Sequence, residues 1–120
     1  RLGESPARPH LMTMILRRWT GRIRTADEAE YRAYIADTGG SDYLSTPGNL
    51  GWQMLFRDLG DGTSEVTTLS WWTDLTVIKA FAGEEYERAR YYPEDDRFLL
   101  DRPPGVDHFR VADGSGPLKA

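Results

Sequence analysis

Two strand-like runs joined by a glycine-rich turn constrain the fold of this chain more than any other feature. Residues 50–59 and 64–72 contain the aromatic and aliphatic side chains typical of strands, and Gly60-Asp61-Gly62 separates the two runs. Glycine readily adopts the positive φ angles that hairpin turns need. Trp71 and Trp72 are adjacent, so their side chains must lie on opposite faces of a sheet. The segment therefore predicts a β-hairpin with large apolar groups on both faces.

A helix is predicted before the hairpin. Thr25 followed by Glu28 is a capping-box pattern, which marks a helix N-terminus. The helix has an apolar stripe at helical spacing, formed by Tyr31, Tyr34 and Ile35. Gly39-Gly40 is expected to end it, and residues 41–49 are expected to form a loop.

A second helix is predicted after the hairpin. Thr73 or Asp74 is expected to cap it, and Gly83 to end it. Its buried side consists of Leu75, Ile78, Phe81 and Ala82. A shorter helical piece is expected at residues 84–89, and Pro93 marks a further helical N-terminus because proline favours the first turn.

The remaining strands complete the predicted topology. Residues 13–20 form a first strand, with Arg17 and Trp19 on one face, and residues 106–111 form a last one. The order is β-α-β-β-α-β, which predicts an α+β, ferredoxin-like split β-α-β domain with a four-stranded antiparallel sheet. Helices cover one face of such a sheet, so we expect a homodimer in which the other faces meet.

Length and composition set further limits. A chain of 120 residues is expected to form one domain, which we assign to residues 13–112 between a flexible N-terminal arm at 1–12 and a tail at 113–120. The net charge of −4 argues against nucleic-acid binding, and the absence of cysteine excludes disulfides and thiolate metal sites. No apolar run approaches the ~20 residues of a membrane span, so we expect a cytoplasmic protein with no membrane partner.

Short motifs along the chain resemble those of the antibiotic biosynthesis monooxygenase family. They are Arg17-x-Trp19-x-Gly21, Pro47-Gly48-Asn49, Trp72, Ile78-x-x-Phe81-Ala82-Gly83, Tyr92-Pro93-Glu94-Asp95, Leu99 and Asp107-His108-Phe109. The resemblance extends over residues 13–112 and implies a dimeric α+β barrel with a cavity between the sheet and the helices of each subunit.

The resemblance also implies a class of reaction. Better-studied members oxidise phenols or hydroquinones to quinones with O₂, without metal or flavin, so no cofactor is expected. A haem-degrading branch uses an asparagine on the first strand, a tryptophan on the second helix and a later histidine. Here the corresponding positions hold Arg17-Arg18-Trp19, Phe81 and Tyr91, which argues against haem degradation.

Three residues are candidates for catalysis: His108, Arg17 and Tyr92. His108 has the near-neutral intrinsic pKa of a proton acceptor, although it can equally be a hydrogen-bonded histidine at a sheet or dimer surface. Arg17 can stabilise a substrate oxyanion, or it can pair internally with Glu94 or Asp95. Tyr92 can donate a hydrogen bond to a substrate oxygen.

Aromatic side chains are the candidates for substrate binding. These are Trp19, Trp52, Trp72, Phe81 and Tyr91, each of which can alternatively belong to the core. The acidic run Glu94-Asp95-Asp96 is expected to cap a helix and pair with Arg88, Arg90 or Arg97 rather than to bind metal.

Taken together, the sequence predicts a cofactor-independent monooxygenase acting on an aromatic or polyketide-like phenol or hydroquinone. Two alternatives stay open. One is a non-catalytic or stress-response dimer that binds a hydrophobic metabolite, and the other is a structural dimer whose cavity is filled by its own side chains. A cavity of several hundred Å³ would favour the oxygenase or the binding protein over the third.

Overall fold

The computed structural model describes residues 13–115, so the predicted arm at 1–12 and the end of the predicted tail lie outside the described residues. The strands are β1 (Ile15–Arg24), β2 (Asn49–Asp58), β3 (Thr63–Trp72) and β4 (Asp107–Arg110). The α-helices are α2 (Glu28–Ile35), α3 (Ser41–Ser45) and α4 (Leu75–Ala82). Short 3₁₀ turns η1 (Thr25–Asp27) and η3 (Pro93–Arg97) and a π-turn η2 (Ala36–Gly40) complete the order. The predicted α+β class and β-α-β-β-α-β order are confirmed.

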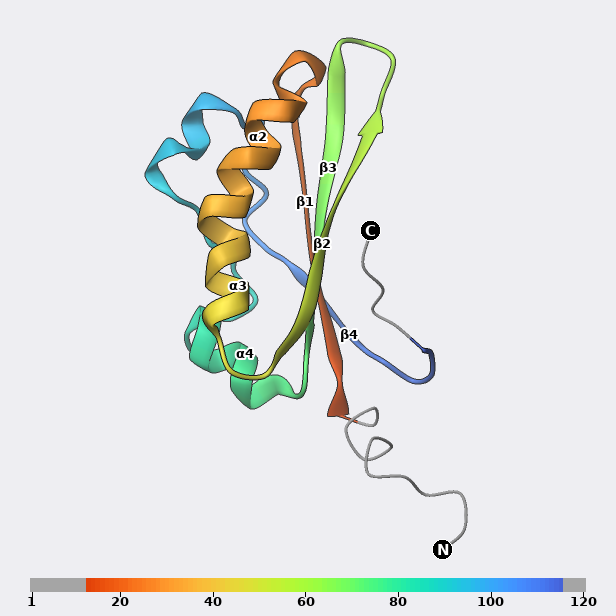
Figure 1. Cartoon of the computed structure of the whole chain (residues 1–120), viewed down its shortest axis with the longest axis vertical. Helices are drawn as coiled ribbons and strands as arrows, with labels where there is room; N and C mark the ends of the chain where they lie inside the picture. The colour runs from red at the N-terminus through yellow and green to blue at the C-terminus, as the bar shows by residue number, and fades with distance from the viewer. Residues whose placement is uncertain (1–12, 116–120) are drawn as a thin grey trace, which may run out of the picture.

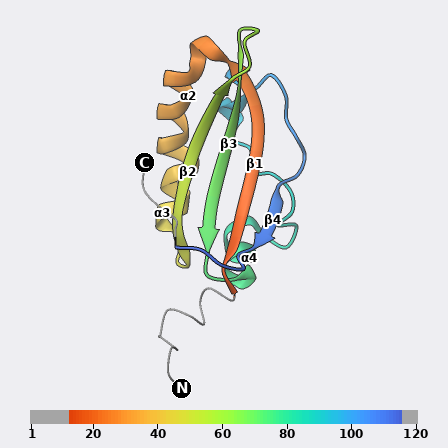
Figure 2. The same cartoon turned by 90° about the vertical axis from the view of Figure 1, so that its right-hand side faces the viewer.

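The four strands form one antiparallel sheet in the order β2-β3-β1-β4 (Figure 2). β1 and β3 pair along their whole length, from Ile15 opposite Trp72 to Arg24 opposite Thr63. β2 and β3 form the predicted hairpin, in which Gly60 and Gly62 both have positive φ. β4 pairs only with the first residues of β1, and this register places His108 directly opposite Arg17.

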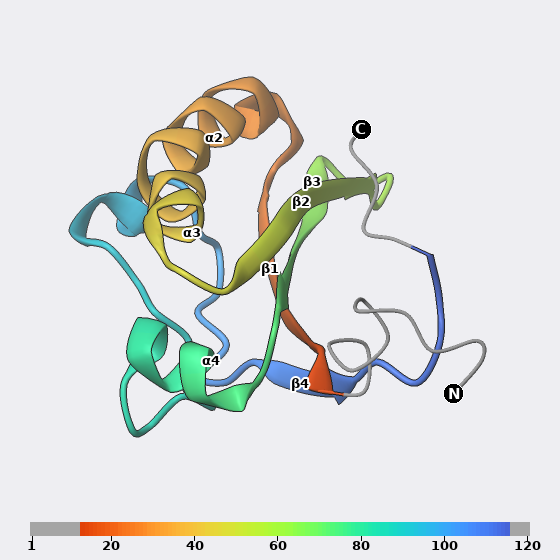
Figure 3. The ribbon, with the colours of Figure 1, turned by 60° about the horizontal axis from the view of Figure 1, so that its bottom comes forward.

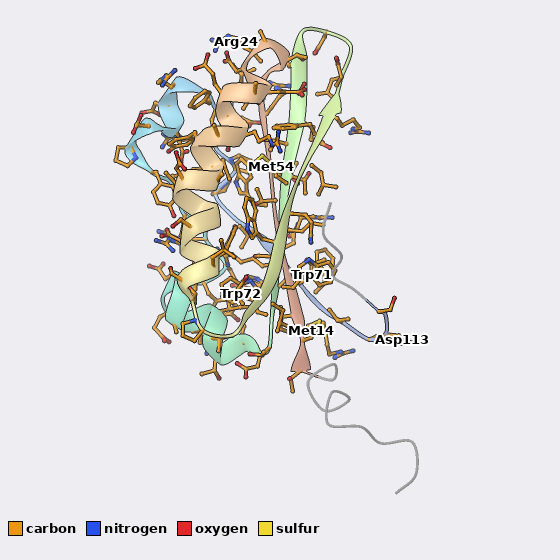
Figure 4. All side chains as sticks on the ribbon, in the orientation of Figure 1. Met14, Arg24, Met54, Trp71, Trp72 and Asp113 are labelled. Atoms are coloured by element: carbon orange, nitrogen blue, oxygen red, sulfur yellow. The ribbon has the colours of Figure 1, made fainter. Side chains whose placement is uncertain are left out.

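All the helices lie on one face of the sheet (Figures 1 and 3). The faces of β3 alternate accordingly, because Ser64, Val66, Thr68, Ser70 and Trp72 are buried while the residues between them are partly exposed. Figure 4 shows Trp72 on the helix side and Trp71 on the other side, as predicted from their adjacency. The core joins the sheet to α2 and consists of Ile23, Tyr31, Ile35, Val66 and Phe98.

The first helix differs from its prediction at both ends. Thr25 and Glu28 make no capping box; instead the Thr25 hydroxyl and the Glu28 carboxylate both hydrogen-bond to the Ser64 hydroxyl on β3. Gly39-Gly40 does not end the helix, because Gly40 keeps helical angles and the chain continues through η2 into α3. A Cβ at Gly40 would lie 2.4 Å from the Trp52 indole, so glycine is needed there for close packing and not for termination.

The second helix follows its prediction closely. Asp74 caps α4 by accepting a hydrogen bond from the Val77 amide, and Gly83 follows its last residue with a positive φ. The predicted helical piece at 84–89 is wrong, since the chain there forms turns.

The segment from 83 to 106 is irregular but fastened along its length. Arg88 and Gly105 form an isolated β-bridge, supported by hydrogen bonds from Ala89 N to Pro104 O and from Val106 N to Glu87 O. Figure 3 shows this segment running past α3 and α2 before it returns to the sheet at β4. Within residues 13–115, no helix is both long and apolar enough to cross a membrane.

Candidate functional site

A cavity lies between the helix-covered face of the sheet and the elements packed on it. Its volume is about 60 Å³, and it is partly open to solvent. It is lined by Arg17, Trp19, Tyr31, Ile35, Gly39, Tyr43, Thr68, Phe81, Arg90, Tyr91, Tyr92, Asp95, Leu99 and Val106. The volume is well below the several hundred Å³ expected of an oxygenase or a binding protein, so the lining side chains largely fill the space and a ring-sized ligand requires some of them to move.

Five of the eight predicted site residues line this cavity: Arg17, Trp19, Phe81, Tyr91 and Tyr92. The other three lie behind its wall. Trp72 is fully buried against Phe81, with ring centroids 4.9 Å apart, and Trp52 packs against Gly40 and Tyr43. His108 lies beside Arg17, on the side away from the cavity lining.

Arg17 is one of two arginines that line the cavity, and it is only 5% exposed. Its Nη1 donates to the Tyr86 carbonyl and to His108 Nε2, the latter at 3.0 Å, and Nη2 donates to the Arg88 carbonyl at 3.2 Å. A guanidinium carries five N–H groups, so one hydrogen on Nη2 and the one on Nε have no acceptor among residues 13–115. The charge is therefore held in place while part of its donor capacity is unused.

No carboxylate within the described range lies at ion-pair distance from Arg17. The predicted internal pair with Glu94 or Asp95 is therefore absent. Asp95 is buried and instead accepts a 2.6 Å hydrogen bond from the Tyr92 amide, which caps η3. Burial lowers the pKa of Arg17, because it disfavours the charged guanidinium. The interaction with Tyr43 opposes this shift, and repulsion from the charge of Arg90 adds to it.

Of the rest of the acidic run, Asp96 pairs with Arg102 on the surface. The predicted pairing with Arg88, Arg90 or Arg97 is wrong, because these arginines pair with Glu85, Asp42 and Glu30 instead. Between residues 13 and 115 no three His, Asp or Glu side chains gather in a metal-binding group.

His108 is held as a neutral acceptor. A guanidinium has no lone pair to offer, so Arg17 must be the donor and the Nε2 of His108 the acceptor. Burial, and then the charge of Arg17, lower the pKa of His108 to about 4. The atom that would accept a substrate proton is thus already occupied, and the catalytic-base role predicted for His108 does not match its geometry.

The hydroxyl groups of Tyr91 and Tyr92 both donate hydrogen bonds to other groups of the protein. The Tyr92 hydroxyl donates to the Asp42 carboxylate, and burial together with this bond raises its pKa. The Tyr91 hydroxyl donates to the Pro103 carbonyl and accepts from Trp19 Nε1 at 3.1 Å. Burial raises the pKa of Tyr91 as well. Both rings shape the cavity, but neither hydroxyl hydrogen is free for a ligand.

Nine of the fourteen lining residues were not among the predicted site residues, and Tyr43 and Arg90 are two of them. The Tyr43 ring packs at tilted or edge-on angles against Trp52, Trp72 and Phe81, and its hydroxyl has no hydrogen-bond partner among residues 13–115. The sequence predicts a loop at Tyr43, because Gly39-Gly40 is expected to end the preceding helix. Arg90 lies over the Phe81 ring, 4.6 Å from its centroid, and no spacing in the sequence distinguishes it from the neighbouring arginines.

Solved structures similar to this one share its fold at low sequence identity. A proposed antibiotic biosynthesis monooxygenase from Bacillus cereus is 15% identical, with a TM-score of 0.57 over 88% of this chain and 99% of its own. Another from Caulobacter crescentus is 16% identical, with a TM-score of 0.58 over 89% and 97%. The chain has the antibiotic biosynthesis monooxygenase fold.

A haem-degrading protein from Mycobacterium tuberculosis has the same fold as well, at 16% identity and a TM-score of 0.56, over 87% of this chain and 100% of its own. Neither a protein-family model nor a curated protein matches the sequence. Structural similarity at identities this low establishes the fold alone. The chemistry must be argued from the residues of the cavity.

Proposed function

We propose that this chain is a monooxygenase that oxidises an aromatic or polyketide-like phenol or hydroquinone with O₂, without metal or flavin. The observation that carries the proposal is Arg17, a buried cation with unused donors and no carboxylate partner within residues 13–115, at the wall of an aromatic cavity. A buried charge is costly unless it is compensated, so the site favours an anionic ligand. Similar structures proposed as antibiotic biosynthesis monooxygenases add support.

The chemistry fits a substrate that supplies its own electrons. In the oxygenation of a phenol to a quinone, one oxygen atom of O₂ becomes the new carbonyl and the other leaves as water. The substrate provides all four electrons that O₂ gains, and its phenolate form gives them up most readily. Arg17 would stabilise that phenolate oxygen, while Trp19 and Phe81 provide apolar walls for the ring.

The described lining residues hold no side chain suited to act as a base near neutral pH. Tyr91 and Tyr92 have raised pKa values, and Asp95 caps a turn. His108, which does not line the cavity, accepts its hydrogen bond from Arg17. The substrate would therefore lose its proton to solvent, and Arg17 would favour that loss by binding the anion.

The same observation favours a second candidate, a non-catalytic dimer that binds a hydrophobic anion in this cavity. The two are separated by O₂ consumption, measured with an oxygen electrode on a panel of hydroquinones and anthrone-like phenols. Turnover that disappears in Arg17→Met supports the oxygenase. Saturable binding of the same compounds without O₂ uptake or quinone formation supports the binding protein instead.

A further inference from the structure

We infer that His108 is a positioning residue, whose imidazole holds the Arg17 guanidinium so that its unused N–H groups are presented to the oxyanion of an aromatic ligand. This inference rests on the proposed anionic substrate, and it gives His108 a role different from proton abstraction.

The geometry surrounds one end of the guanidinium with neutral acceptors. Both hydrogens of Nη1 are used, one by the Tyr86 carbonyl and one by His108 Nε2 at 3.0 Å. The Arg88 carbonyl takes one hydrogen of Nη2 at 3.2 Å. These acceptors fix the plane of the guanidinium but leave its charge uncompensated, which is the arrangement needed to bind an anion.

Two parts of the fold keep these acceptors in place. The imidazole is fixed by strand register, because His108 on β4 pairs directly with Arg17 on β1. The carbonyls of residues 86 and 88 are fixed by the bridge between Arg88 and Gly105. Arg17 is thus held between a neighbouring strand and a fastened loop.

The surroundings of His108 keep it neutral. The Tyr86 ring meets the imidazole edge-on at 5.3 Å between centroids, and Lys79 lies over the same Tyr86 ring, with its Nζ 5.7 Å from the centroid. Asp107, its neighbour in sequence, is paired with Arg18 on the opposite face. Arg17 contacts Nε2 itself, so protonation there would place two cations in contact, and the ring hydrogen belongs on Nδ1.

Two variants of similar polarity separate positioning from simple packing. His108→Gln can place an amide oxygen near the position of Nε2, whereas the shorter side chain of His108→Asn reaches only the region of Nδ1. The probes are 4-nitrophenolate and 4-nitroanisole, which share a nitroaromatic ring but differ in charge. Binding is measured by titration with the intact chain, and thermal melting verifies that each variant is folded.

We expect His108→Asn to bind 4-nitrophenolate about tenfold more weakly than wild type, because the cation loses its fixed orientation. His108→Gln is expected to stay within about threefold of wild type, since it retains an acceptor for Nη1. Affinity for 4-nitroanisole is expected to change little in both variants.

Three results would overturn the inference. The first is an equal loss of affinity for the charged and neutral probes, which indicates packing alone. The second is identical behaviour of the Gln and Asn variants. The third is a wild-type protein that binds 4-nitrophenolate no better than 4-nitroanisole, which leaves no anion for Arg17 to hold.

A measurement without ligand tests the same geometry. In ¹⁵N NMR at neutral pH, His108 is expected to show a protonated Nδ1 and an unprotonated Nε2, with the signal assigned by its loss in His108→Gln. The opposite tautomer or a doubly protonated ring would contradict the inference. Failure of the proposed oxygenase activity is detected separately, as absence of O₂ consumption with intact anion binding.

Discussion

Arg90 and Asp42 connect the segment after α4 to α3 beside the cavity, with Nη2 and Oδ2 3.6 Å apart. Arg90 is also a lining residue, and Asp42 accepts the hydroxyl hydrogen of Tyr92, another lining residue. The carboxylate thus partly neutralises the second cation of the cavity, whereas Arg17 has no such partner within residues 13–115. The charge available to a ligand therefore depends on this pair.

Removing the charge of Asp42 should strengthen anion binding. Asp42→Asn keeps an acceptor for Tyr92 but frees Arg90, so we expect a two- to fivefold gain in affinity for 4-nitrophenolate, of the order of one exposed ion pair. Arg90→Gln should produce a loss of similar size. Because both side chains are 40% exposed, unfolding free energies should change by no more than about 1 kcal/mol in urea titrations. Effects of the same sign in the two variants would contradict this account.

Loss of Arg17 should affect binding far more than folding. Arg17→Met leaves two carbonyls and an imidazole unsatisfied rather than a stranded carboxylate, so we expect a cost of about 1–3 kcal/mol instead of 3–5 kcal/mol. Affinity for 4-nitrophenolate should fall tenfold or more, and Arg17→Lys should recover part of it. Arg18→Met, on the opposite face of the same strand, is the matched control and should bind normally. A cost near 5 kcal/mol would point to an ion pair after all.

The lowered pKa of His108 predicts a specific loss of stability in acid. In the unfolded chain His108 takes up a proton near its ordinary pKa of 6.5, while in the folded chain it does so only near pH 4. Its contribution is therefore complete above pH 6.5 and is lost as the pH falls toward 4. Allowing for the partial exposure of His108, we expect roughly 1–2 kcal/mol. Urea unfolding at pH 7 and pH 5 measures it, and wild type should lose more stability than His108→Gln.

Gly21 is predicted to determine where the Trp19 indole lies. A Cβ at Gly21 would come 2.4 Å from Trp19 Cη2, so Gly21→Ala must displace a ring that lines the cavity and donates to Tyr91. We expect a loss of about 1–3 kcal/mol from overpacking, with a change in tryptophan fluorescence and weaker binding of 4-nitroanisole. Gly39→Ala is the control, because its Cβ would meet only Ile35, at 4.0 Å. Equal behaviour of the two variants would mean that Trp19 adapts without cost.

Homodimerisation through the uncovered face of the sheet remains a prediction. Leu55 on β2 and Phe109 on β4 lie on that face and are 46% and 41% exposed. Figure 2 looks onto this face, which no helix covers. Light scattering at micromolar concentration should give the mass of a dimer, and Leu55→Glu should shift it toward the monomer. Leu44→Glu, at a 77% exposed position on α3, should leave the mass unchanged. A monomeric wild-type protein would contradict the predicted dimer of facing sheets.

Local signals in the sequence predicted most of the scaffold. The Gly60-Asp61-Gly62 turn, the Asp74 cap and the Gly83 stop each act within a few residues, so their effects can be inferred from spacing alone. The helix end predicted at Gly39-Gly40 was wrong, because the role of Gly40 is set by the Trp52 indole, which lies on a strand later in the chain. A glycine that permits contact and a glycine that ends a helix look the same in sequence.

Part of the cavity lining could be predicted from the sequence, but its hydrogen bonds could not. Arg17, Trp19 and Phe81 line the cavity, because strand and helix periodicity place them on the buried side. The acceptors of Arg17, however, are backbone carbonyls of residues 86 and 88, in a segment without periodicity. A carbonyl is common to every residue type, so no sequence pattern could have indicated these partners over the carboxylates of Glu94 and Asp95.

The bridge between Arg88 and Gly105 has a consequence for how this protein can diversify. The hydrogen-bonded sheet carries Arg17, whereas the irregular connection supplies the carbonyl groups that orient its guanidinium. Changes in the length or composition of residues 83–92 could redirect the cation without disturbing the register of β1, β3 or the core. The ligand preference of this protein could therefore change through one connection, with little effect on the stability of its sheet and core.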